Sequence, residues 1–174
     1  MQSLPPVCFV SFAKRVRPPR PVCHTLATPV AEALSEAMQV LCCGEESAVL
    51  AFRRLTRRRQ LPPAALHCCR TIAQEEMWHD CLLQDLRGSL TTPQHDDELI
   101  AAITQFYQSL AHQDTLHHLM QICALDSGAC IMFAALRKAG RPVRNDAAVD
   151  SIFAAIHADE ARHVQTARTI VREL

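Results

Sequence analysis

Glycine and aromatic residues are scarce in this chain of 174 residues. It contains four glycines, one tryptophan and one tyrosine, whereas alanine, leucine, arginine, glutamine and glutamate are plentiful. The plentiful residues are those that favour helices over strands. The composition therefore predicts an all-α fold.

Three further absences exclude classes of function. No apolar run approaches the ~18 residues of a membrane span, so no membrane partner is expected. The formal net charge is zero, so nothing favours nucleic-acid binding. None of the nine cysteines forms a Cys-x-x-Cys pair, which argues against a zinc ribbon or a rubredoxin-like iron site. We expect the cysteines to be reduced apolar residues in a cytoplasmic protein, with a redox-active thiol pair as the alternative.

The N-terminal segment, residues 1–28, lacks acidic side chains. It carries five prolines and a basic cluster: Lys14, Arg15, Arg17 and Arg20. It also lacks the apolar stretch and cleavage site of a secretory signal. A loosely ordered tail over the rest of the protein is expected, while an organelle transit peptide and a short lid remain open. Residues 29–174 are expected to form one domain.

A repeated pattern of metal-ligand side chains dominates those residues. Glu160 and His163 stand three residues apart, as do Glu76 and His79. At that spacing both side chains share one face of a helix. A single carboxylate precedes each pair by roughly thirty residues, the length of a helix hairpin. These carboxylates are Glu45 and Asp126.

The two upstream carboxylates occur in matching local sequences. The chain reads EESAVLAF from Glu45 and DSGACIMF from Asp126, with alanine at plus three and phenylalanine at plus seven in both. This similarity indicates an internal duplication of a helix hairpin. Glu46 is the alternative to Glu45, although it lies about 100° around the helix from Glu45 and from the apolar residues on the same face.

These six residues resemble the metal ligands of the ferritin-like di-iron carboxylate proteins, which include rubrerythrins and non-haem di-iron oxygenases. In that family two helices each give a carboxylate and two others each give Glu-x-x-His. The resemblance covers residues 29–172 and implies a ferritin-like four-helix bundle with a long crossover that contains an extra helix. Asp126 departs from the usual glutamate and is one methylene shorter.

Periodicity and breaker residues predict where the helices lie. Thr28 should cap the first helix, Gly140 should end the helix that carries Asp126, and Asn145 should cap the last helix. The expected helices span 29–59, 63–87, 95–111, 115–139 and 146–172, with a bend near 111–115.

The resemblance also assigns supporting roles. Asp159 is expected to orient His79, and Glu75 to orient His163, through the imidazole nitrogen that faces away from the metal. Four further histidines are expected at the rim or surface of the bundle: His112, His117, His118 and His157. Tyr107 is distant in sequence from the ligands, so no radical role is expected for it.

The implied function is that of a non-haem di-iron oxidase or oxygenase. Two iron ions, or manganese or a mixed pair, would activate dioxygen to oxidise a small organic or carrier-bound substrate, with an external electron donor and a possible homodimer. A ferroxidase or a peroxide-scavenging erythrin-like protein is the nearest alternative. A metal-free helical interaction protein and a thiol-based redox protein are alternatives of other classes.

Overall fold

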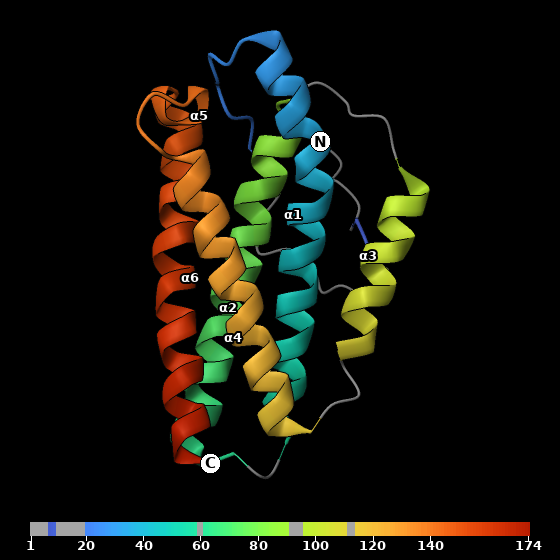
Figure 1. The fold of residues 1–174 in the computed structure, drawn as a ribbon, viewed down its shortest axis with the longest axis vertical. Coiled ribbons are helices and arrows are strands. Elements are labelled where there is room, and N and C mark those ends of the chain that lie inside the picture. The colour runs from blue at the N-terminus through green and yellow to red at the C-terminus, as the bar shows by residue number, and fades with distance from the viewer. Residues whose placement is uncertain (1–6, 10–19, 59–60, 91–95, 111–113) are drawn as a thin grey trace.

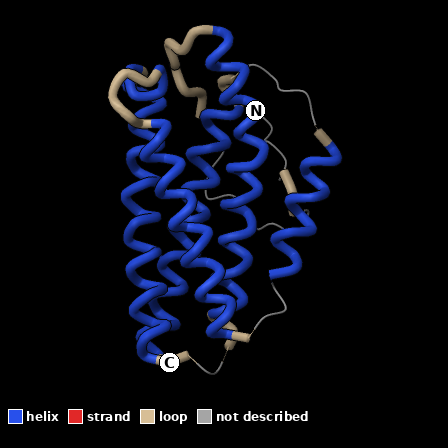
Figure 2. The backbone as a smooth tube through the Cα atoms, viewed as in Figure 1, coloured by secondary structure: helices blue, strands red, loops and turns tan. Residues whose placement is uncertain are grey.

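The computed structural model describes residues 7–9, 20–58, 61–90, 96–110 and 114–174. Its helices are α1 (Thr28–Leu55), α2 (Pro63–Arg87), α3 (Asp97–Leu110), α4 (Thr115–Leu136), α5 (Pro142–Asn145) and α6 (Ala147–Glu173). All regular structure in the described residues is helical (Figure 2). The all-α prediction is therefore confirmed.

The four long helices, α1, α2, α4 and α6, lie side by side with their axes roughly aligned (Figure 1). They pack most extensively in two pairs, α1 with α2 and α4 with α6, and α2 meets α6 across the centre. α3 lies outside, against α1, in the connection where the sequence predicts an extra helix. The chain thus folds as two helix hairpins, as expected from the repeated ligand pattern.

The helix starts agree closely with the proline positions. α2 spans Pro63–Arg87, as predicted. α1 begins one residue earlier than predicted, because Thr28 is already helical and Ala27 is the N-cap, without a side-chain hydrogen bond. α1 also ends at Leu55, about a turn before the predicted end. Proline at the first turn is favoured because its missing N–H needs no helical partner there.

The predicted cap of the last helix is wrong by one residue. Asn145 ends the short helix α5, and Asp146 caps α6. The Oδ1 atom of Asp146 accepts the N–H of Val149 at 3.0 Å. Its Oδ2 atom accepts the N–H and the hydroxyl of Thr25, at 2.5 and 2.9 Å. The Asp146 carboxylate therefore caps α6 and also binds Thr25 in the segment that precedes α1.

The break between α3 and α4 falls where a bend is predicted. α3 ends at Leu110 and α4 begins at Thr115, and residues 111–113 lie outside the described part of the chain. α4 ends at Leu136, sooner than predicted. Gly140 has the expected positive φ of 80°, but it lies in the turn after the helix rather than at its end.

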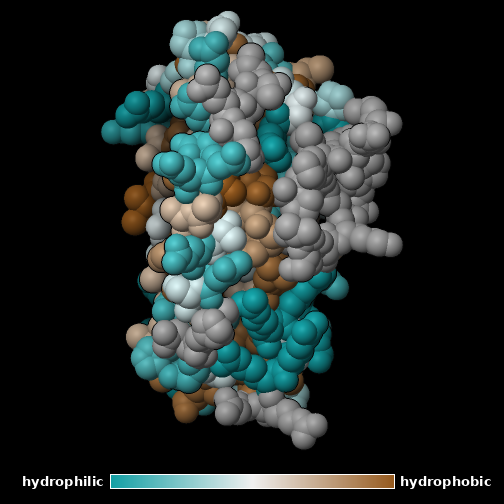
Figure 3. Space-filling view, turned by 90° about the vertical axis from the view of Figure 1, so that its right-hand side faces the viewer, coloured by the Kyte–Doolittle hydropathy of each residue, from teal (hydrophilic) through white to brown (hydrophobic). Residues whose placement is uncertain are grey.

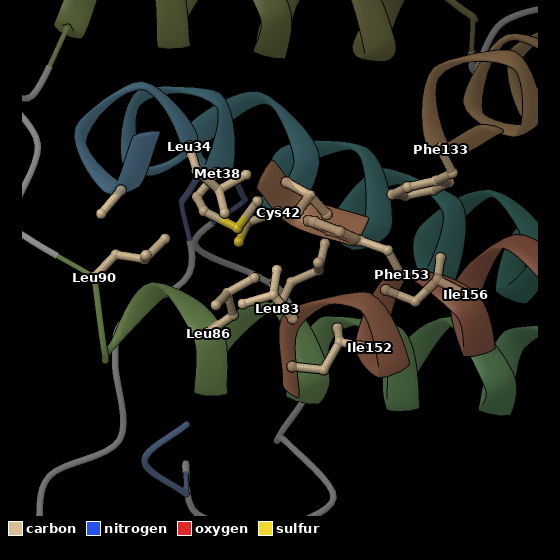
Figure 4. Packing of buried hydrophobic residues seen from close by; sticks show 13 residues of the cluster. Leu34, Met38, Cys42, Leu83, Leu86, Leu90, Phe133, Ile152, Phe153 and Ile156 are labelled. Carbon is tan, nitrogen blue, oxygen red and sulfur yellow. The ribbon is translucent and has the colours of Figure 1, made fainter. Parts of the chain in front are cut away.

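The core consists of two apolar clusters at different heights in the bundle. The first is built from α1, α2, α4 and α6, and Figure 4 shows its close packing around Met38, Phe133 and Phe153. The second contains Phe52 and Leu119 and lies toward the other end of the same helices. On each of the four helices the predicted ligands fall between the residues of one cluster and those of the other. The two clusters therefore enclose a polar layer.

α4 has an apolar side that the described part of the chain leaves exposed. Leu116, Met120, Ile131 and Met132 are all exposed, and Ile131 is 72% exposed. By length and composition α4 could cross a membrane, contrary to the expectation from the sequence, although one such helix is weak evidence. It also carries Asp126 in its middle, where it packs against α6.

The described part of the N-terminal segment is fixed to the bundle. A disulfide joins Cys8 to Cys43, so the expectation that every cysteine is reduced is wrong for this pair. The backbone N–H groups of Val7, Cys8 and Phe9 all donate to the carboxylate of Glu46. The basic side chains Lys14, Arg15 and Arg17 lie outside the described residues. The remaining seven cysteines are free thiols.

The double role of Asp146 predicts a pH-dependent effect. Burial opposes its ionisation, but the N–H groups of Val149 and Thr25 hold the pKa of Asp146 below its usual value. That stabilisation is present above the unfolded pKa of about 3.9 and is lost as the pH falls through the lower folded value. Asp146→Ala should reduce the free energy of unfolding by about 2 kcal/mol at pH 7. The difference from the wild type should shrink below about pH 4.

Urea denaturation at several pH values measures this effect. The control is Asn145→Ala, which changes an exposed neighbour and should stay within about 0.5 kcal/mol of the wild type. Equal losses for the two variants would contradict the assignment of the cap.

Candidate metal centre

Six side chains predicted as ligands converge between the two apolar clusters. They are Glu45 of α1, Glu76 and His79 of α2, Asp126 of α4, and Glu160 and His163 of α6. None is more than 8% exposed. Their ligand atoms form two groups, each with all atoms within 4.8 Å of one another: Glu45, Glu76, His79 and Glu160; and Asp126, Glu160 and His163. Glu160 belongs to both groups, so the groups adjoin one another.

The two imidazoles enter this layer in the same orientation. His79 Nδ1 lies 3.5 Å from Glu45, 3.3 Å from Glu76 and 3.3 Å from Glu160. His163 Nδ1 lies 3.0 Å from Glu76 and 3.7 Å from Glu160. The rings stack with their centroids 5.8 Å apart. Both histidines therefore turn Nδ1 to the carboxylates and Nε2 away from them.

Several of these inward-facing atoms lack a hydrogen-bond partner among the described residues. They are Glu45 Oε2, Glu76 Oε1, Asp126 Oδ2 and His163 Nδ1, and all four are buried. Buried polar atoms are usually paired, because an unpaired one costs free energy. His163 Nδ1 and Glu76 Oε1 approach to 3.0 Å without hydrogen-bonding geometry. Lone pairs that converge on a shared position instead of on each other are typical of ligands around a cation.

The outward-facing nitrogens are held by carboxylates of the opposite helix. His79 Nε2 of α2 lies 3.0 Å from Asp159 of α6, and His163 Nε2 of α6 lies 2.9 Å from Glu75 of α2. Both contacts expected from the resemblance are therefore present. The guanidinium of Arg162 donates to Asp159 and to Glu75, each at 2.7 Å, and so joins the two supports.

The charges in this layer perturb one another strongly. Burial, and then the neighbouring carboxylates, raise the pKa of Glu45, Asp126 and Glu160. Burial also acts on Glu76, but His163 and His79 outweigh it and lower the pKa of Glu76 to about 2. Burial opposes a charge on His79, yet Glu160, Glu45 and Glu76 raise its pKa. Burial and mutual repulsion therefore disfavour the ionised forms of Glu45, Asp126 and Glu160, an effect that a bound cation would offset.

The donor set fits a divalent metal ion. Four carboxylates and two imidazoles are oxygen and nitrogen ligands of the kind that iron and manganese accept. Binding in such a layer replaces the protons that the buried groups would otherwise hold. The group around Glu160 can thus hold a metal ion, and the fit rests on the unpaired atoms as well as on residue types.

The neighbouring carboxylate Glu46 is occupied elsewhere. It is fully buried, but its two oxygens accept the three N–H groups of Val7, Cys8 and Phe9. It is also absent from both groups of close ligand atoms. The geometry therefore favours Glu45 over Glu46 as the member of the cluster from α1.

A cavity of about 260 Å³ adjoins the carboxylates. Its lining includes Glu45, Glu76, Asp126 and Glu160, and most of the remainder is apolar and comes from α1, α3 and α4. Tyr107 of α3 contributes to this lining. A methyl group at Gly44 would lie 3.4 Å from the Tyr107 hydroxyl, an ordinary contact distance, so the tyrosine side chain reaches α1 beside this glycine.

The sequence reasoning missed Tyr107 as a neighbour of the site. Burial and then Glu45 raise its pKa, with Asp126 contributing, which places the phenol in the electrostatic field of the ligands. The one available signal was Gly44, whose position before Glu45 suggests a close approach. The expected surface position of His118 is also wrong, because it is only 3% exposed and lines the cavity. His117 is exposed, as expected, and His112 lies outside the described residues.

Comparisons of the chain with protein-family models, with curated proteins and with solved structures found no match. The ferritin-like resemblance therefore rests on the ligand pattern and its geometry alone.

The two outer carboxylates generate a paired prediction. Asp159→Asn and Glu75→Gln remove the negative charge that orients each imidazole, so each should weaken binding of Mn(II) about 10- to 100-fold. Because the two contacts are related by the repeat, the two losses should be similar. Equilibrium dialysis with metal analysis measures the affinity. Glu36→Gln, an exposed carboxylate on α1, is the control and should not change it.

Proposed function

We propose that this protein is a ferritin-like non-haem di-iron oxidase or oxygenase. Glu45, Glu76, His79, Asp126, Glu160 and His163 would hold two iron ions, with manganese as a possible substitute. The metal pair would supply dioxygen activation, and the chain would present a small organic substrate beside it.

The observation that carries this proposal is the position of the cavity. Its apolar wall meets the open side of the carboxylate layer at Glu45, Glu76, Asp126 and Glu160. An apolar pocket with a few convergent polar groups is the usual form of an organic ligand site. A path for hydrated iron ions would instead be expected to be polar. The cavity therefore favours oxidation of an organic substrate over storage or oxidation of iron.

Different residues of the chain would bind the cations, orient the imidazoles and line the substrate cavity. The carboxylates neutralise the cations, and the crossed contacts with Asp159 and Glu75 hold Nδ1 of each imidazole toward the centre. Each histidine would carry its proton on Nε2, within hydrogen-bonding distance of the outer carboxylate. The apolar lining limits the access of water to the reacting face. Dioxygen, an external electron donor, a second copy of the chain and a cytoplasmic location remain predictions.

Repeated addition of Fe(II) in air separates the proposed function from its nearest alternative. After two iron ions per chain have bound and reacted, further Fe(II) should be oxidised no faster than in the presence of Glu160→Ala. The reason is that an oxygenase retains its metal and does not pass iron through the site. Absorbance of Fe(III) against time measures the rate.

Two results would overturn the oxygenase. Sustained, fast oxidation of many Fe(II) ions per chain would indicate a ferroxidase. Rapid consumption of hydrogen peroxide by the loaded protein, absent from Glu160→Ala, would indicate a peroxide-scavenging protein.

A further inference from the structure

A second set of polar side chains lines the cavity away from the carboxylates. Arg54 follows Glu45 by nine residues on α1, and His118 precedes Asp126 by eight residues on α4. At 1.5 Å per helical residue, these offsets correspond to about 12–14 Å. The side chain of Arg58, three residues beyond the end of α1, donates to Thr115 at 3.0 Å, which brings the segment after α1 against the first turn of α4. Arg54 and His118 therefore lie toward the same end of the cavity.

The polar end contains buried atoms without partners among the described residues. His118 is 97% buried by area, and its Nδ1 atom has no hydrogen-bond partner. The Oε1 atom of Gln121, which also lines the cavity, is buried and unpaired. Such atoms are destabilising unless a bound molecule or water satisfies them. They belong to neither group of candidate metal ligands.

The charge at this end is positive. Burial, and then Arg58 and Arg54, lower the pKa of His118 to about 4, so its imidazole is neutral at pH 7 and offers one N–H. Arg54 adds a guanidinium, which is well suited to a carboxylate. Gln121 can turn its amide to present N–H instead of oxygen. A ligand group that accepts hydrogen bonds and carries negative charge would satisfy all three residues.

The remaining wall is mainly apolar. Leu50, Ile122 and Leu125 are among the side chains that line it. The volume of about 260 Å³ lies just below the usual range for drug-sized ligands of about 300–1,000 Å³. On the side of α3, Figure 3 shows apolar surface at mid-height and mainly hydrophilic surface lower down. The lining of the cavity therefore suits a small ligand that is apolar at one end and charged at the other.

We propose that this cavity binds a medium-chain aliphatic monocarboxylate. Its carboxylate lies against Arg54, His118 and Gln121, and its apolar chain extends to the carboxylates of the metal centre. This assignment names the substrate class of the proposed oxygenase. Binding of the ligand does not depend on the proposed function. Only a reaction at the apolar end of the ligand rests on that function.

Binding of matched ten-carbon probes tests the assignment. Decanoate, 1-decanol and decylamine are titrated calorimetrically into the chain of 174 residues, both without added metal and after loading with Mn(II). Decanoate should bind at least about tenfold more tightly than the other two, because only its head group pairs with the guanidinium. Equal binding of decanoate and decanol, or binding of none of the probes, would overturn the proposal.

Variants locate the head group. Arg54→Gln changes an exposed side chain, and His118→Phe keeps the ring volume, so each should weaken decanoate binding about tenfold or more without loss of the fold. Arg57→Gln is the matched control, since Arg57 is an exposed arginine of the same region that does not line the cavity. Unchanged decanoate affinity in both Arg54→Gln and His118→Phe would contradict the assignment.

The two proposals can fail separately. Decanoate binding that depends on Arg54 and His118 in a protein that binds no metal would support the ligand and contradict the di-iron function. Normal metal binding in a protein that binds decanoate no better than decanol would contradict the ligand assignment and leave the di-iron function standing.

Discussion

The burial of four carboxylates in one layer of a helical bundle is the constraint on which the rest of the structure depends. Glu45, Glu76, Asp126 and Glu160 are each almost inaccessible to solvent. Unpaired charges in such a place are strongly destabilising. Two imidazoles offset only part of this negative charge. A layer of this composition is therefore stable as a cation site or as a partly protonated cluster, and the unpaired atoms favour the former.

The surrounding structure supports that layer from two directions. Above and below it, the apolar clusters hold the four helices at fixed positions. At its outer side, Asp159 and Glu75 reach across from the opposite helices to the imidazoles, and Arg162 links them. This crossing repeats the same contact in both hairpins. The repeat in the sequence is thus visible as a repeated interaction in space.

The sequence predicted the features that depend on local spacing. Because a helix repeats every 3.6 residues, the spacing of apolar residues in α2 and α6 places Glu76, His79, Glu160 and His163 on the buried faces of these helices. Proline positions predicted the start of α2 for an equally local reason. The cap of α6 was predicted one residue too early. Asn145 and Asp146 are both residue types that cap helices, and the tertiary contact with Thr25 favours Asp146.

Features that depend on contacts between distant segments were not predictable in the same way. The disulfide from Cys8 to Cys43 depends on how the N-terminal segment crosses α1, which no local pattern encodes. Tyr107 and His118 reach the cavity only because α3 and α4 pack beside α1. Glu46 resembles a ligand in sequence, and only its contacts with the N-terminal backbone assign it another role.

Metal content is the most direct test of the claim that the buried layer is a binuclear metal site. Protein loaded anaerobically with Fe(II) and freed of excess metal should retain two iron ions per chain. Glu160→Ala should lose both, because Glu160 belongs to both groups of ligand atoms, whereas Glu46→Gln should retain two. A wild-type protein that retains no iron, or a Glu160→Ala variant that folds and retains as much iron as the wild type, would contradict the account.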